Sequence, residues 1–289
     1  MILRPVRDDD EDADLVREIT AAAFGAPHVL GAGPPAPHPA AEREHDRTRH
    51  LARTDPGGCW IAEDEAAGPV GAVLSSRREG TWALSLLVVA QGAQGKGVGK
   101  ALMARALVHG RACLRGIICG SRNPVAARTY RRAGFTLHPA MRLTGVVDPA
   151  RLAPSDGAVH EGTERHRDLM DSVDRRTRGG AHGPDHEQLF RHFRLLVVDD
   201  LAGSGYCYVD ERGVETLAAT SRRLATRLLT AALLTVPEGR QVRVAELTAE
   251  QEWAVDVGLA AGLEVSNAGY VCLRGMRPPN PFIPSELFA

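Results

Sequence analysis

The stretch that decides the fold is Gln94-Gly95-Lys96-Gly97-Val98-Gly99, which follows a strand ending at Val89 and leads directly into an apolar helical segment. Glycines lack side chains, so backbone N–H groups here can approach an anion closely. The first turn of the following helix adds unpaired N–H donors and the positive end of its dipole. The stretch therefore predicts a loop that binds phosphate groups.

Other phosphate-binding motifs fit this stretch poorly. A Walker loop needs a glycine where Gln94 stands and Ser or Thr where Ala101 stands, and a dinucleotide fingerprint needs a glycine where Lys100 or Leu102 stands. The only lysines of the chain, Lys96 and Lys100, lie in or beside the loop, which favours phosphate contact. A strand-to-helix turn that binds no ligand is the remaining alternative.

The loop resembles the coenzyme A loop of the GNAT superfamily of N-acetyltransferases, which reads Gln/Arg-x-x-Gly-x-Gly/Ala and is matched here by Gln94, Gly97 and Gly99. A second family element follows in the expected order, as Asn123, Ala126, Tyr130, Gly134 and Phe135. The resemblance covers roughly residues 1 to 147, including Leu3-Arg4-Pro5-Val6, and departs at Gln91, where many members have proline.

The resemblance implies acetyl-CoA as a co-substrate and assigns roles to individual residues. The expected cofactor-binding residues are Leu87, Val88, Val89, Gln94, Gly95, Lys96, Gly97, Val98, Gly99, Lys100 and Asn123. The backbone of Leu87 to Val89 would pair with the pantetheine arm and polarise the thioester carbonyl. Tyr130 would be the catalytic residue that protonates the coenzyme A sulfur, because a phenol keeps its proton at neutral pH. A tyrosine that only packs its ring is the alternative.

The general base is not identified by the sequence. No Glu or Asp lies between Trp82 and Val89, where some family members place one, and Ser85 is the only polar side chain inside that strand. Ser85 either orders a water that relays the proton or merely faces outward.

The pattern of elements predicts an α/β (α+β) fold, with a mixed, mostly antiparallel central sheet flanked by helices. Strands are expected at 2–6, 59–63, 70–75, 82–89, 116–119 and 141–147, with helices at 11–24, 40–52, 98–111 and 124–133. A proline-rich loop is expected at 31–39.

The second half repeats this order. Aligning Gly262-Leu263 with Gly134-Phe135 gives an offset of 128 residues (262 − 134). We predict a catalytic GNAT domain at 1–147, a linker at 148–162 and a degenerate GNAT-like domain at 163–289, the layout of tandem GNAT proteins. The stretch from Ser221 to Thr226 has no glycines, and Gly258 stands where Tyr130 would fall, so we expect no chemistry in the second half.

Composition and charge limit the classes of partner that the chain is expected to bind. The formal net charge is −1 and hydrophobic residues make up 44% of the chain, which favours a globular protein and implies neither a nucleic-acid nor a membrane partner. No secretory signal is recognised at the N-terminus, so we expect a cytoplasmic protein whose five scattered cysteines are free thiols. No pair of cysteines has zinc-ligand spacing and the histidines are dispersed, so no metal is expected. A homodimer is allowed.

The predicted function is N-acetyl transfer from acetyl-CoA to a primary amine, of a small molecule, by direct attack in a ternary complex. Two alternatives stay open: a non-catalytic regulator that binds acyl-CoA, and an enzyme that acetylates a protein N-terminus or a lysine. The proline-rich tail from Arg277 to Pro284 either packs across a domain or a partner, or is disordered.

Overall fold

The structure, a computed structural model, describes residues 1–24, 39–153 and 156–289. Most of the predicted proline-rich loop therefore lies outside the described residues, and Pro39 begins a helix. The chain divides into two compact units, Met1–Cys113 and Leu114–Ala289, and each is described by itself.

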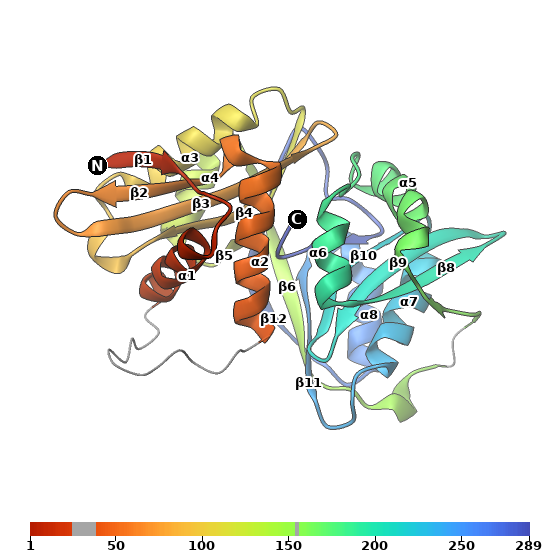
Figure 1. The fold of residues 1–289 in the computed structure, drawn as a ribbon. Helices are drawn as coiled ribbons and strands as arrows, with labels where there is room; N and C mark the ends of the chain where they lie inside the picture. The colour runs from red at the N-terminus through yellow and green to blue at the C-terminus, as the bar shows by residue number, and fades with distance from the viewer. Residues whose placement is uncertain (25–38, 154–155) are drawn as a thin grey trace. The chain divides into compact units, whose positions relative to one another are not determined.

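Unit 1 is a four-stranded antiparallel sheet with helices on both faces. Its strands lie in chain order, β1 (Ile2–Pro5), β2 (Trp60–Asp64), β3 (Gly68–Arg78) and β4 (Thr81–Val89). In Figure 1, α1 (Asp10–Phe24) and α2 (Pro39–Thr54) lie in front of this sheet and α3 (Val98–His109) lies behind it. Residues 70–76 of β3 are all buried, because both faces of the sheet are covered.

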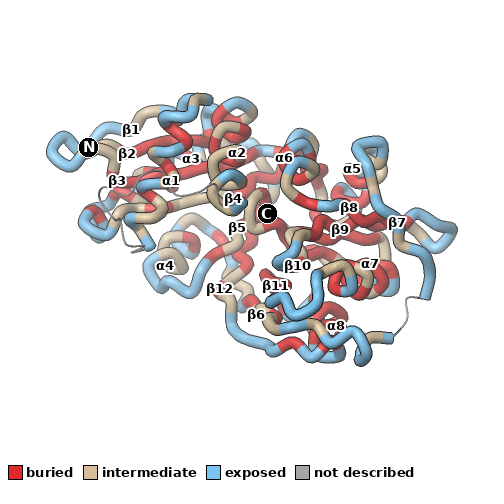
Figure 2. The backbone as a smooth tube through the Cα atoms, turned by 60° about the horizontal axis from the view of Figure 1, so that its bottom comes forward, coloured by how far each residue is buried: buried red, intermediate tan, exposed pale blue. Residues whose placement is uncertain are grey.

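Unit 2 contains a larger sheet with the strand order β5-β12-β6-β11-β10-β9-β8-β7, to which β13 adds on β10. The strands are β5 (Arg115–Ser121), β6 (Thr136–Val146), β7 (His160–Glu161), β8 (Arg194–Asp200), β9 (Gly203–Asp210), β10 (Gly213–Ala219), β11 (Gln241–Leu247), β12 (Glu264–Arg274) and β13 (Phe282–Ile283). The pairs are antiparallel except β10–β11, which is parallel. The helices are α4 (Pro124–Arg132), α5 (Arg167–Thr177), α6 (Asp185–His192), α7 (Arg222–Leu234) and α8 (Glu252–Ala260). Figure 2 shows the buried backbone of β8, β9 and α7 in red.

The predicted fold class and duplication are confirmed. The series β2-β3-β4-α3-β5-α4-β6 is followed by β8-β9-β10-α7-β11-α8-β12. The starts of α4 and α8 differ by 128 residues (252 − 124), as do those of β6 and β12 (264 − 136). Gly134 and Gly262 end the two matching helices with nearly the same positive φ, 87° and 85°.

The sequence did not predict that the two repeats exchange their last strands. Strand β12 of the second repeat pairs with β5 of the first, and β6 of the first repeat pairs with β11 of the second. β6 and β12 also pair with each other. This exchange explains why the compact units divide after Cys113, whereas the repeat of elements divides at the predicted linker. The domain boundaries 1–147 and 163–289 stay a prediction about the repeat.

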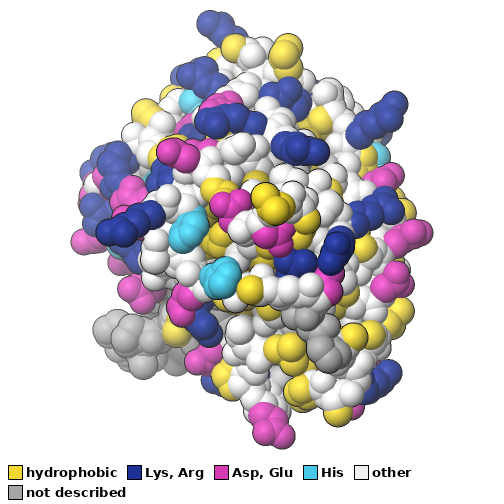
Figure 3. Space-filling view, turned by 90° about the vertical axis from the view of Figure 1, so that its right-hand side faces the viewer, with side chains coloured by type: hydrophobic (Ala, Val, Ile, Leu, Met, Phe, Trp, Pro, Cys, Tyr) yellow, Lys and Arg dark blue, Asp and Glu magenta, His cyan; other side chains and the backbone are white. Residues whose placement is uncertain are grey.

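Three further observations concern the thiols, the surface charges and the length of the helices. All five cysteines are free, three of them buried and two partly so. Acidic and basic side chains are interspersed over the face shown in Figure 3, which agrees with the small net charge. Within the described ranges, no helix has the length and apolar character needed to cross a bilayer.

Candidate functional site

The predicted phosphate loop joins β4 to α3 in unit 1. The side chain of Gln94 donates from Nε2 to the carbonyl of Val89 at 3.0 Å, which ties the start of the loop to the end of the strand. Gly95 and Gly97 have φ of 78° and 87°, in the left-handed region that favours glycine. The backbone of the loop therefore requires glycine at both positions.

The N-terminus of α3 presents donors that no side chain caps. Gly97 is the N-cap residue and has no side chain, and the first helical hydrogen bond runs from Ala101 N–H to the Gly97 carbonyl at 3.0 Å. The amides of Val98, Gly99 and Lys100 precede that bond, so they lack an intrahelical acceptor. Lys96 and Lys100 are both exposed here. This arrangement can bind an anion through backbone amides and two ammonium groups.

A bulge distorts β4 just before the residues expected to pair with a pantetheine arm. Leu74 faces Leu86 and Ser75 faces Leu84, so Ser85 is the extra residue of the bulge. A bulge bends its strand and strengthens the local twist, and such bulges are common beside active sites. Ser85 therefore marks a point where the carboxyl end of β4 changes direction.

The second predicted element lies in unit 2, on β5 and α4. Asn123 is the N-cap of α4, and its Oδ1 accepts from the amide of Val125 at 2.8 Å. That cap uses the carbonyl of the side chain and leaves its NH₂ group as a donor. Asn123 thus has a structural role in addition to the predicted one.

Tyr130 is buried, with 6% of its surface exposed, and its ring lies over Gly120 of β5, where an added Cβ would come within 3.0 Å of the ring. Burial, with Cys272 and Cys119 close by, raises the pKa of the phenol well above its usual value, so it stays protonated at neutral pH. Within residues 1–24, 39–153 and 156–289, its hydroxyl has no hydrogen-bond partner. Packing and proton donation are compatible for this side chain.

Comparison with known proteins agrees with this geometry. Residues 21–135 match the model of the acetyltransferase (GNAT) family. This segment of the chain matches a GNAT acetyltransferase domain. The matched residues include the bulged strand, the glycine loop and the Gly134-Phe135 pair, in agreement with the predicted family. No curated protein sequence matches the chain.

Several solved structures share the fold over almost the whole chain. A putative acetyltransferase from Pyrococcus horikoshii has a TM-score of 0.75 at 18% identity, covering 100% of this chain and 95% of its own. A tandem GNAT protein from the clavulanic acid biosynthesis pathway has a TM-score of 0.57 at 14% identity, covering 96% of this chain and 99% of its own. A GCN5-related N-acetyltransferase from Sphaerobacter thermophilus has a TM-score of 0.58 at 14% identity, covering 94% and 95%. At these identities the likeness establishes the fold.

The matching helix N-terminus of the second repeat is already capped. Ser221 is the N-cap of α7, and its hydroxyl accepts from the amide of Leu224 at 3.4 Å. Arg227 in the next turn donates to the carboxylate of Asp156 at 2.7 Å and to that of Asp200 at 2.8 Å. Where the glycine loop of the first repeat offers uncapped amides, the second repeat pairs one amide and the Arg227 guanidinium with its own residues.

The matching strand of the second repeat is also occupied. β10 has a bulge at Glu215, since Val214 faces Val209 and Thr216 faces Tyr208. Counting from the bulges, Leu217 and Ala218 correspond to Leu87 and Val88, and these two residues pair with Ile283 and Phe282 of β13. The proline-rich tail therefore packs as a strand, which resolves the alternatives left open by the sequence. Its backbone occupies the edge of β10 that corresponds to the predicted pantetheine-binding edge.

The second repeat also differs from the first at the position of the predicted catalytic tyrosine. Gly258 of α8 stands at the position of Tyr130, and a Cβ there would meet the side chain of Leu143 at 2.4 Å. The exchanged strand β6 thus leaves no space for a ring in the second repeat.

A buried ion network that the sequence did not predict fixes the far end of α3. Asp55 accepts from Arg78 at 2.6 Å and from the backbone amide of Arg77 at 2.8 Å, and it lies 3.0 Å from Nε2 of His109. Burial alone would raise the pKa of Asp55, but hydrogen bonds from His109 and the charge of Arg78 hold it below its usual range. The network joins the end of α2, β3 and α3, which positions the helix whose other end carries the loop.

Glu246 is the second ionisable residue that sequence reasoning missed. Its φ is 60°, at an irregularity of β11, and its Oε2 is buried without a hydrogen-bond partner among the described residues. Burial, together with the charge of Glu286, raises its pKa to about 7 despite Arg243 and Arg142 nearby. No sequence pattern marks such a residue, because its strain and burial arise from long-range packing.

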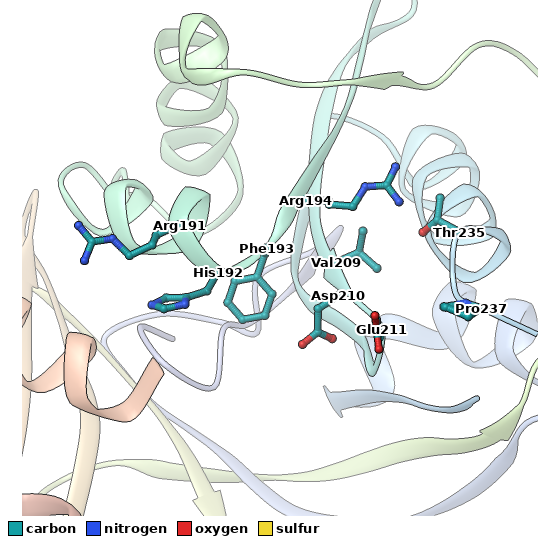
Figure 4. A pocket seen from close by; sticks show the side chains of 9 residues that line it. All are labelled: Arg191, His192, Phe193, Arg194, Val209, Asp210, Glu211, Thr235 and Pro237. Atoms are coloured by element: carbon teal, nitrogen blue, oxygen red, sulfur yellow. The ribbon is translucent and has the colours of Figure 1, made fainter. Parts of the chain in front are cut away.

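A surface pocket lies within unit 2. Figure 4 shows it where side chains of α6, β8 and the β9–β10 turn surround a volume of about 470 Å³. Its lining residues are Arg191, His192, Phe193, Arg194, Val209, Asp210, Glu211, Thr235 and Pro237. None of the predicted site residues is among them, so this pocket carries no argument about acetyl transfer.

Proposed function

We propose that the chain is an acetyl-CoA-dependent N-acetyltransferase that acts on a primary amine of a small molecule. The observation that carries the proposal is the β4–α3 loop, whose left-handed glycines and uncapped helix N-terminus fit a pyrophosphate. Membership of the matched segment in the GNAT family supports acetyl transfer as the reaction. The acceptor class rests on the resemblance alone.

In this proposal the residues of unit 1 bind the co-substrate. The amides from Gly95 to Lys100 would hold the pyrophosphate, with Lys96 and Lys100 adding positive charge. Backbone groups of Leu87 to Val89 would pair with the pantetheine arm, and an N–H there would stabilise the oxyanion that forms as the amine attacks. The bulge at Ser85 supports this role because it turns the end of β4.

The residues of unit 2 complete the assignment. The NH₂ group of Asn123 would donate to the co-substrate, and Tyr130 would donate its proton to the sulfur. During transfer an N–C bond forms between amine and acetyl carbon, the C–S bond breaks, and the leaving thiolate takes the proton of the phenol. The proton lost by the amine goes to water or to a base that the proposal leaves unnamed.

We also infer one active site per chain. In the second repeat, Ser221 caps the helix and β13 pairs with the strand, so the groups that would bind acyl-CoA are already satisfied. Gly258 offers no acid.

The test is coenzyme A release from acetyl-CoA, followed with a thiol reagent, in the presence and absence of a panel of primary amines. The proposal expects release that depends on a particular small amine, and a Tyr130→Phe variant that still binds coenzyme A but turns over at least about 10² times more slowly. Tyr270→Phe, a change in β12 at a residue with no assigned role, is the matched control and should keep full turnover.

Two results would favour the alternatives. Equal release with and without every amine, with coenzyme A binding intact, favours a regulator that binds acyl-CoA without catalysis. Acetylation of peptides but of no small amine favours a protein acetyltransferase. Unchanged turnover of Tyr130→Phe would remove this residue from the mechanism.

A further inference from the structure

A cluster of buried metal-binding side chains lies in the second repeat, away from every residue assigned above. Asp174 of α5, His182 of the α5–α6 connection and His186 of α6 are each fully buried. One potential ligand atom from each lies within 4.8 Å of the other two. Along the chain they are separated by irregular segments, and only the packing of α5 and α6 on β9 brings them together.

The tautomer of His186 determines which of its two ring nitrogens can bind a metal ion. Its Nδ1 lies 3.2 Å from the hydroxyl of Tyr208, and that hydroxyl donates onward to the sulfur of Met170. The oxygen of Tyr208 therefore accepts from Nδ1–H, which leaves the lone pair of His186 on Nε2. This buried Nε2 has no hydrogen-bond partner among the described residues.

Two carboxylates face that lone pair. Nε2 of His186 lies 3.5 Å from Oδ1 of Asp171 and 3.5 Å from Oδ2 of Asp174. Ligand atoms bound to one ion at about 2.0–2.2 Å in a tetrahedron are separated by roughly 3.4 Å, so the spacing between His186 and Asp174 is compatible with a shared cation. A lone pair that faces buried carboxylates requires a positive charge beside it.

The surrounding groups orient the carboxylates as a second shell of hydrogen bonds does in metal sites. The hydroxyl of Tyr206 donates to Oδ1 of Asp174 at 2.6 Å, and the amide of His182 donates to Oδ2 at 3.0 Å. The amide of Gly183 donates to Oδ1 of Asp171 at 3.2 Å. Each carboxylate is thus fixed by groups that leave it facing the centre of the cluster.

His182 supplies a further nitrogen. Its Nδ1 lies 2.7 Å from Oδ2 of Asp174, a distance at which Nδ1–H donates to the carboxylate, so the lone pair is on Nε2. That Nε2 is buried and has no hydrogen-bond partner among the described residues.

We propose that Asp174, His182 and His186 bind one divalent transition-metal ion, with Zn²⁺ as the ion that two imidazoles and a carboxylate fit, and that Asp171 lies beside His186 as a further carboxylate. The three ligands are fully buried, so the site is structural. It joins α5, the α5–α6 connection and α6 into one rigid element packed on β9. The proposal departs from the sequence expectation that no metal is bound, and it is independent of the acetyl-transfer proposal.

The test uses the full chain and Zn²⁺ itself. Because the site is buried, the protein is refolded from guanidinium chloride either with equimolar ZnCl₂ or with EDTA, and unbound metal is removed by gel filtration. Elemental analysis should find about one zinc per chain after the first procedure, and the thermal midpoint should rise by roughly 5–10 °C relative to the EDTA sample.

Matched variants decide between the bound ion and simpler explanations. His186→Gln and Asp174→Asn should retain less than about a tenth of an equivalent of zinc and lose the zinc-dependent rise, whereas His160→Gln, at an exposed histidine, should behave as the unmodified chain does. Zinc retained equally by His186→Gln would indicate binding elsewhere and overturn the proposal. Absence of metal from the unmodified chain, with equal midpoints in ZnCl₂ and EDTA, would also overturn it and assign the positive charge to a proton on His186.

Discussion

Replacing Glu246 by glutamine should stabilise the protein above neutral pH and leave its stability nearly unchanged in acid. Only 7% of this residue is exposed, and one carboxylate oxygen has no partner among the described residues. Burial and the charge of Glu286 raise its folded-state pKa from 4.5 to about 7. Glutamine keeps the size of the side chain and the left-handed backbone, so the strain at φ 60° is the same in both proteins and cancels.

The size of the change in unfolding free energy follows from the linkage between proton binding and folding. Between pH 4.5 and 7 the folded chain keeps the proton on Glu246 while the unfolded chain has lost it, so stability falls as pH rises through this window. A difference of about 2.5 in pKa, at 1.36 kcal/mol for each pH unit, corresponds to about 3 kcal/mol lost by pH 7 and above. The neutral amide has no such dependence, so Glu246→Gln should be more stable than the unmodified chain by up to about 3 kcal/mol at pH 8.

The assay is urea denaturation at intervals from pH 4.5 to 8.5, followed by circular dichroism. Glu264→Gln, the same change at an exposed position of β12, controls for the substitution itself. The difference in unfolding free energy between Glu246→Gln and the unmodified chain should grow with pH and level off above about 7. A difference that stays constant with pH would refute the reasoning, because it would show that Glu246 titrates alike in the folded and unfolded chain.

Three further predictions concern unit 1. Gly97→Ala places a side chain on a residue with φ of 87°, at a cost of about 1–2 kcal/mol. Calorimetry should therefore show coenzyme A binding weakened about tenfold or more. The control variant Gly92→Ala should bind coenzyme A as the unmodified chain does. Asp55→Asn leaves a buried guanidinium without its anion and should lower the unfolding free energy at neutral pH by about 3–5 kcal/mol; a loss below about 1 kcal/mol would contradict the network. Because the pKa of Asp55 is lowered in the folded chain, its contribution to the unfolding free energy is present above the ordinary carboxyl pKa and should disappear in acid. The difference in unfolding free energy between the unmodified chain and Asp55→Asn should therefore become smaller as the pH falls. Gly110→Ala places a Cβ 2.4 Å from the ring of Trp82 and should cost about 1–3 kcal/mol by thermal denaturation, again with Gly92→Ala unchanged.

The features predicted correctly from sequence are those encoded locally. Apolar periodicity and the positions of the glycines placed the helices and strands, and the glycines at 95 and 97 indicated a left-handed loop because that backbone conformation strongly favours glycine. Gly262-Leu263 revealed the repeat because a helix end followed by a buried residue has a short, recognisable pattern.

The features missed depend on residues far apart in the chain. Strand exchange leaves no local mark, since β6 and β12 have the same alternation whichever neighbour they pair with. Asp55 and Arg78 are separated by 23 residues, and Asp174 and Tyr206 by 32, so only the folded chain shows that these charges are buried and paired. The histidines of the second repeat looked dispersed for the same reason.

The strand exchange gives the second repeat a role that does not depend on chemistry of its own. β5 and α4, which carry Asn123 and Tyr130, belong to the compact unit that contains the whole second repeat. β5 pairs with β12 through six successive residues from Gly269 to Arg274, so its neighbour is supplied by the last strand of the second repeat. Without that strand, the backbone groups along this edge of β5 would lose their partners, and the Cys272 thiol and the backbone carbonyl of Tyr270 would no longer cover the Gly120 region on which Tyr130 packs. Selection for the proposed acid in the first repeat would therefore preserve the fold of the second, even after its helix N-terminus and its strand edge were taken over by Ser221 and the C-terminal tail.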